Sequence, residues 1–178
     1  MRNIFRRGAS VPAEVTARAG LERGDTVLAG ALADDGTWLL GTRDALVLVT
    51  PDAVRKVPWE RVETADWDRD EGRLRVVEVG DFGRERPVHV LTVPDPGLLL
   101  AMVRERVTAS VLLQRRVLVR GRRGLTVIAR RPPRGRGDVT WAYEFDAGVD
   151  PEEPLVVQAA ADGLRAAQEE LGSDEQSI

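Results

Sequence analysis

The sequence contains no cysteine, one histidine and one lysine, and only 4% of its residues are aromatic. The absence of cysteine excludes disulfide bonds, thiol chemistry and zinc–thiolate sites. With His89 as the single imidazole, histidine-pair metal sites are excluded and general-base catalysis has few candidates. The longest apolar run, residues 98–103, has six residues, whereas a membrane-spanning helix needs about 18–20. We therefore expect no membrane insertion.

Length and composition indicate an ordinary folded domain, or one domain with an appended piece. The chain has 178 residues, of which 43% are hydrophobic and 31% charged. The first ten residues lack the apolar segment and cleavage site of a secretory signal, so we expect a frayed tail and a cytoplasmic protein. No nucleophile is accompanied by a base, and no metal or nucleotide motif is complete. We therefore expect no catalytic activity and no cofactor.

Charge is divided into blocks along the chain, although the net charge is only −3. Residues 104–137 contain eleven arginines and one acidic residue, a net charge of +10. Residues 138–178 contain eleven acidic residues and one arginine, a net charge of −10. The favoured interpretation is that the acidic end folds back on the basic block. The alternatives are an anionic partner for the basic block and a cationic partner for the acidic end.

The arginine block supplies the candidate binding residues. Arginine grips phosphate through paired hydrogen bonds, as in nucleic-acid binding. Base stacking would have to come from Trp141 and Tyr143, so sequence-specific reading is not expected. The candidate anion- or nucleic-acid-binding residues are Arg115, Arg116, Arg120, Arg122, Arg123, Arg130, Arg131, Arg134 and Arg136.

Short apolar runs separated by turn residues predict seven strands ahead of the arginine block. The clearest turn is Asp34-Asp35-Gly36, because glycine accepts the positive φ that tight hairpins require. His89 falls on the seventh strand and is interpreted as an ordinary sheet residue, and the four tryptophans as core or half-core residues. The predicted strands are residues 26–33, 37–42, 45–50, 55–59, 62–67, 73–79 and 88–93.

Three helices are predicted: one before the seven strands, one directly after them, and one near the C-terminus. A short helix-compatible stretch covers residues 13–19. Asp95 followed by Pro96 predicts the start of an amphipathic helix that continues to about residue 114. The remaining expected elements are strands at 117–120, 125–131 and 139–145, loops rich in arginine and glycine at 121–124 and 132–138, and a helix at 154–171 ended by Gly172.

Two segments resemble bacterial pleckstrin-homology-like domains. They are GTRDALVLV at 41–49 and VPWERV at 57–62 ahead of ADW at 65–67. The resemblance covers about residues 25–114 and implies seven antiparallel strands closed by one helix. The whole chain also resembles a group of uncharacterised actinobacterial proteins, which implies no activity. Lipid-binding members of the family carry basic residues in the first hairpin loop, where this chain has Asp34 and Asp35, so phosphoinositide binding there is not expected.

These observations predict an α+β protein. Its expected parts are an N-terminal tail with a short helix (1–24), a pleckstrin-homology-like seven-stranded bent sheet or partly open barrel with its capping helix (25–114), a basic β-hairpin and an acidic C-terminal helix (115–171), and a disordered tail (172–178). The favoured function is a non-catalytic cytoplasmic protein-interaction or scaffold module. The alternative is sequence-non-specific binding of RNA or DNA through the arginine-rich hairpin.

Overall fold

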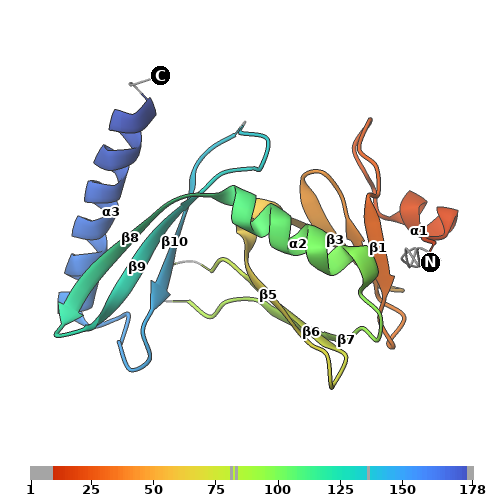
Figure 1. Ribbon diagram of the computed structural model, residues 1–178, viewed down its shortest axis with the longest axis horizontal. Helices are drawn as coiled ribbons and strands as arrows, with labels where there is room; N and C mark the ends of the chain where they lie inside the picture. Colours follow the sequence, from red (N-terminus) through yellow and green to blue (C-terminus); the bar gives the residue numbers. More distant parts are fainter. Residues whose placement is uncertain (1–9, 81, 83, 136, 176–178) are drawn as a thin grey trace, which may run out of the picture.

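The computed structural model describes residues 10–175 with the exception of 81, 83 and 136. The described residues form three antiparallel sheets and three α-helices, which confirms the α+β prediction. The helices α1 (Ala13–Arg18) and α3 (Pro154–Glu175) lie at opposite ends of the molecule, with α2 (Gly97–Ser110) between them (Figure 1). In this part of the chain no helix has the length and apolar content needed to cross a bilayer.

The first sheet consists of β1 (Ala29–Leu32), β2 (Trp38–Gly41), β3 (Ala45–Val49) and β4 (Val54–Pro58), in that spatial order. Between β1 and β2 the predicted hairpin turn is confirmed, since Gly36 has a φ of +85°. Every residue of β3 is buried, because one face of the strand packs into the main core and the other packs under α1. This explains why its sequence is continuously apolar rather than alternating.

The second sheet consists of β5 (Val62–Asp68), β6 (Arg73–Glu78) and β7 (Val88–Thr92). A short 3₁₀ helix, η1 (Trp59–Arg61), separates β4 from β5. The seven predicted strands are therefore all present, but they form sheets of four and three strands and not one seven-stranded sheet or a closed barrel. Both sheets and α2 contribute to the same buried cluster.

Tryptophans and α2 fill the space between the first two sheets. Trp59 is fully buried and donates its indole N–H to the Thr42 carbonyl at 3.1 Å. Trp67 is half-buried and donates its indole N–H to the Val93 carbonyl at 3.2 Å. Trp38 and Trp141 are also half-buried, so the tryptophans have the core and half-core positions that were predicted.

The third sheet is formed by β8 (Val111–Arg120), β9 (Arg123–Arg130) and β10 (Thr140–Phe145), with β9 in the centre. It comes from the basic block and the segment that follows. One of its faces is covered by α3, which packs on β8 and β9. The predicted basic hairpin and C-terminal helix are therefore both present.

The main errors of the sequence-based prediction lie at element ends. The helix predicted to reach residue 114 ends at Ser110, and β8 follows directly from Val111. The reason is tertiary: the Ser110 carbonyl accepts a hydrogen bond from the Arg131 N–H at 2.8 Å, which draws the chain into the sheet. The loop predicted at 121–124 is a two-residue turn in which Gly121 has a φ of +58°, so β9 already begins at Arg123.

At the C-terminus, α3 continues through Gly172 to Glu175, so the prediction that Gly172 ends the helix is wrong. Residues 176–178 of the predicted tail lie outside the described residues. The frayed tail predicted for the first ten residues falls almost wholly on residues 1–9, which also lie outside them.

Candidate interaction surfaces

The hairpin of β8 and β9 has one face under α3 and one face that points away from it. Along β8, half-buried and exposed residues alternate over all ten positions. The half-buried set, including Leu113 and Val117, packs with buried residues of β9 and α3 such as Leu125 and Val156. The exposed set on the opposite face is Leu112, Gln114, Arg116, Leu118 and Arg120.

The helix α3 approaches the hairpin closely at Gly163. A Cβ atom at this position would lie 2.5 Å from Cγ2 of Val117 on β8 and 3.2 Å from Cγ2 of Val127 on β9. Glycine is unfavourable inside a helix by about 1 kcal/mol relative to alanine. Here it lets the helix lie directly over the gap between the two strands, which explains its presence in the middle of α3.

Ion pairs tie the basic hairpin to the acidic end of the chain, as the charge blocks predicted. Arg115 lies 2.8 Å from a carboxylate oxygen of Glu170 on α3, and Arg120 pairs with Glu153 just before that helix. Arg116 binds both carboxylate oxygens of Asp146. These hydrogen bonds from Arg116, together with one from the Gly124 N–H, lower the pKa of Asp146.

The other candidate arginines are distributed over different environments. Arg122 and Arg123 are exposed at the turn and make no ion pair with any described residue. Arg134 lies in the loop before β10 and binds the carboxylate of Asp44, with its Nε at 2.8 Å. Arg131 is half-buried, and Arg136 lies outside the described residues.

Arg130 is an interior residue, with a relative exposure of 3%. Its guanidinium donates to the Ser110 hydroxyl at 3.0 Å, to the Val107 carbonyl at 3.4 Å and to the Glu63 carbonyl at 3.2 Å. It thus joins β9 to the end of α2 and to β5. Burial lowers the pKa of Arg130, while the negative charges of Glu144 and Glu63 oppose that effect. This arginine is positioned to hold the third sheet against the rest of the protein.

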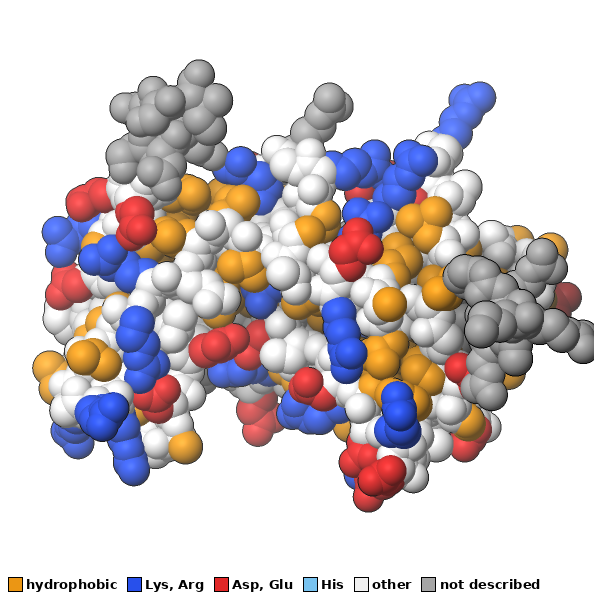
Figure 2. Space-filling view, in the orientation of Figure 1, with side chains coloured by type: hydrophobic (Ala, Val, Ile, Leu, Met, Phe, Trp, Pro, Cys, Tyr) orange, Lys and Arg blue, Asp and Glu red, His pale blue; other side chains and the backbone are white. Residues whose placement is uncertain are grey.

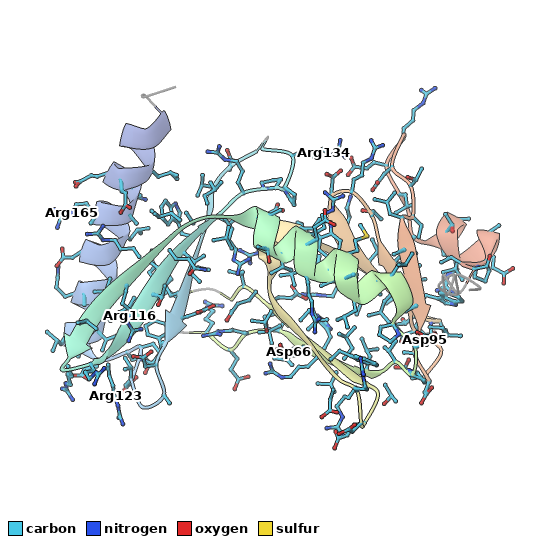
Figure 3. The ribbon with its side chains drawn as sticks, in the orientation of Figure 1. Asp66, Asp95, Arg116, Arg123, Arg134 and Arg165 are labelled. Carbon is cyan, nitrogen blue, oxygen red and sulfur yellow. The ribbon has the colours of Figure 1, made fainter. Side chains whose placement is uncertain are left out.

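The nine candidate arginines do not form one surface. In the β8–β9 ladder, Arg120 lies opposite Arg123 at the turn end of the hairpin. Arg130 lies opposite Val111 at the other end of the ten-residue strand β8. At about 3.3 Å per residue these ends are about 30 Å apart. Arg116 and Arg123 lie near the turn, and Arg134 lies far from them (Figure 3). On the visible face, basic and acidic side chains are interspersed (Figure 2).

A charge cluster around the buried Glu78, not anticipated from the sequence, joins the first two sheets. Glu78 on β6 accepts two hydrogen bonds from Arg55 on β4, at 2.6 and 2.8 Å. His89 lies on β7, the strand position predicted for it. Its Nε2 atom lies 2.6 Å from the same carboxylate of Glu78. Burial acts to raise the pKa of Glu78, but the hydrogen bonds from Arg55 and His89 outweigh burial and lower it.

A groove of about 460 Å³ lies beside the outer edge of β1, and its lining includes the polar residues Thr16, Asp25 and Thr26 as well as apolar side chains. It is bounded by Val11, Leu21 and Val27 on the α1 side and by Leu98 of α2 on the other side. Leu28, also in its wall, is 46% exposed, and Leu98 is 60% exposed. Among the described strands, β1 pairs only with β2, and α2 contacts β1 as well.

The sequence contained a signal for this groove. Three consecutive leucines, Leu98 to Leu100, cannot all face the core from one helix, because successive residues point about 100° apart. In the structure Leu99 is buried, Leu100 is half-buried and Leu98 faces outward. No comparable signal in the sequence marked Glu63 as an interior residue. Its side chain is buried on β5 beside Arg86, and burial raises the pKa of its carboxyl group.

No family model, no curated protein and no solved structure matches the chain. Within the described residues, no group of three or more His, Cys, Asp or Glu side chains is arranged to hold a metal ion. Functional inference for this protein therefore rests on the geometry of its own surfaces.

Proposed function

We propose that the protein is a non-catalytic, cytoplasmic protein-interaction module, in which a pleckstrin-homology-like unit carries an additional sheet and helix. The order of elements supports this relationship: a four-stranded sheet, a three-stranded sheet and then a single helix. Leu99 and Val103 of that helix share a buried cluster with residues of both sheets. Such a unit presents sheet edges and shallow grooves on which a partner can dock.

The groove beside β1, with its exposed leucines, is the observation that carries the proposal. No described strand pairs with the outer side of β1, so its backbone can pair with a partner strand, and exposed Leu28 and Leu98 beside it provide apolar contacts. Together they suit an extended apolar segment of another protein that adds to β1 as a further strand. A nucleic acid, which carries one negative charge per nucleotide, would gain little from this surface.

The nucleic-acid alternative has weaker support. Arg122 and Arg123 are exposed and make no ion pair within the described residues, but Arg115, Arg116 and Arg120 are already bound to carboxylates of the same chain. The aromatic residues available for base stacking, Trp141 and Tyr143, pack in the cluster beneath α3. Both features reduce what the hairpin can offer to RNA or DNA.

Affinity capture from a native cell extract tests the proposal. Proteins held by the wild type should be lost with Leu98→Asp, which places a charge in the groove but suits the first turn of a helix. The control is Val90→Asp, because Val90 is 55% exposed on β7, away from the groove. Nuclease treatment should leave the captured proteins unchanged. Capture that requires nucleic acid, or that ignores Leu98→Asp, would contradict the proposal.

A further inference from the structure

We propose that β8 is a self-association strand, which pairs antiparallel with β8 of a second copy of the chain across a two-fold axis near Arg115. The two three-stranded sheets would then form one six-stranded sheet. This surface lies on a different element from the groove beside β1, so the inference goes beyond the proposed function.

The outer edge of β8 is long and poorly protected. The strand has ten residues, and among the described strands it pairs only with β9. Edge strands are usually protected by charged side chains, above all lysine, or by proline, bulges or short length. β8 contains no proline and no lysine, and its three arginines are each paired with a carboxylate of the same chain. Its two irregularities in register lie near its ends, between Val111 and Leu113 and between Leu118 and Arg120. The regular stretch between them is open to pairing.

The sequence of this strand is nearly the same in both directions. Residues 111–119 read VLLQRRVLV, and in reverse VLVRRQLLV. With Arg115 on the two-fold axis, Leu112 of one copy faces Leu118 of the other, Leu113 faces Val117, and Val111 faces Val119. Gln114 faces Arg116, a polar pair. A two-fold interface requires a surface that is complementary to itself, and this register provides it.

The exposed leucines gain most from this pairing. Leu118 is 62% exposed and Leu112 is 41% exposed, and both lie on the face of β8 that α3 does not cover. Pairing over nine residues would also form about eight to ten backbone hydrogen bonds, as many as a typical protein interface contains.

Charge at the axis does not oppose the association. The two Arg115 side chains would approach each other, but each lies 2.8 Å from a carboxylate oxygen of its own Glu170. The neighbouring Arg116 is likewise bound to Asp146. Like charges opposite each other in a sheet are destabilising, and these carboxylates offset that repulsion.

The helices leave room for the second copy. At Gly163, α3 contacts Val117 of β8 and Val127 of β9, so at this point the helix lies about half a strand spacing inside the edge. Strands are about 4.8 Å apart, so two copies of α3 would lie about 10 Å apart at Gly163, an ordinary helix-packing distance. The wall of α3 beside residues 115–118 of β8 is formed by Ala159, Asp162, Gly163 and Ala166, which leave an open groove of about 420 Å³.

Sedimentation equilibrium tests the association. The wild type should show twice the monomer mass of 19.6 kDa, with monomer appearing on dilution. Leu118→Asp should raise the dissociation constant at least about a hundredfold, because each dimer loses two buried leucines. Leu98→Asp is the matched control, since Leu98 is 60% exposed but lies on α2, and it should leave the dimer intact. A wild type that remains monomeric at about 0.2 mM would overturn the proposed self-association. Failure of the affinity-capture experiment on the groove beside β1 would not affect it, because that experiment tests a different surface.

Cysteine cross-linking tests the register, and the chain has no native cysteine to interfere. Residues directly opposite each other are about 5 Å apart, within disulfide reach. An equimolar mixture of Leu112→Cys and Leu118→Cys chains should therefore form a disulfide-linked pair under mild oxidation. Each variant alone should not, because its two cysteines would be six residues, about 20 Å, out of register. Equal cross-linking of each variant alone would overturn the proposed register.

Discussion

Replacing Gly163 with alanine tests the close approach of α3 to the hairpin. Helix propensity and tertiary packing predict opposite changes in the free energy of unfolding for this substitution. By helix propensity alone, Gly163→Ala should stabilise the protein by about 1 kcal/mol. In the structure, however, the new Cβ would lie 2.5 Å from Val117 Cγ2, whereas carbon atoms in contact are normally about 3.5–4.0 Å apart. Valine is stiff at χ1, so the helix rather than the side chain must move.

Moving α3 by about 1 Å would loosen the packing of Val156, Ala160 and Ala167 against β9. Overpacking typically costs about 1–3 kcal/mol, and an approach of 2.5 Å places this substitution in the upper part of that range, about 2–3 kcal/mol, which exceeds the gain of about 1 kcal/mol in helix propensity. We expect Gly163→Ala to lower the free energy of unfolding by about 1–2 kcal/mol, measured by urea denaturation. Adding Val117→Ala removes the clashing methyl groups, so the Gly163→Ala change should then be much less destabilising.

Gly172→Ala is the matched control, because Gly172 lies on the same helix and its Cβ would contact nothing within 4 Å. That substitution should stabilise the protein by up to about 1 kcal/mol. If Gly163→Ala stabilises it as well, α3 does not lie against β8 as described, and the pairing of the acidic end with the basic hairpin loses its basis.

Three other predictions follow from the charged residues. Arg130→Ala should lower the free energy of unfolding by about 3 kcal/mol, because it leaves buried acceptors unpaired. Arg122→Ala, at an exposed position, should change it by less than about 0.5 kcal/mol. Equal effects of the two substitutions in urea denaturation would contradict the interior role of Arg130. Glu78→Gln should cost about 1–3 kcal/mol at neutral pH. Because the folded-state pKa of Glu78 is lowered, the contribution of its carboxylate to the free energy of unfolding is present above the ordinary glutamate pKa of about 4.3 and is lost as pH falls through the folded-state value. If the wild type and Glu78→Gln differ in the free energy of unfolding by the same amount down to about pH 2, this interpretation is refuted. Vesicles containing anionic lipid should not bind the protein in a flotation assay at about 0.15 M salt, because Asp34 and Asp35 occupy the first hairpin tip; strong binding that is lost on replacing arginines in the first hundred residues would contradict it.

Local signals in the sequence predicted elements whose ends are set by their own residues. The hairpin at Asp34–Gly36 formed as expected because Gly36 takes the positive φ that the turn requires. The end of α2 was misplaced because residues 111–114 fit either a helix or a strand, and pairing with β9 decides between them. No local signal distinguishes buried Arg130 from exposed Arg122, since that difference comes from β5 and α2, which are far away in the sequence.

Hydrogen exchange in the presence of a captured partner tests most directly whether the groove beside β1 is the binding surface. A partner strand added to β1 would bind the backbone N–H groups that point away from β2, so those amides of Ala29–Leu32 should exchange more slowly in the complex than in the free protein. The amides around the turn at Gly121 and Arg122 should be unchanged. Protection at that turn with no change along β1 would contradict the account and would identify the arginine hairpin as the binding surface instead.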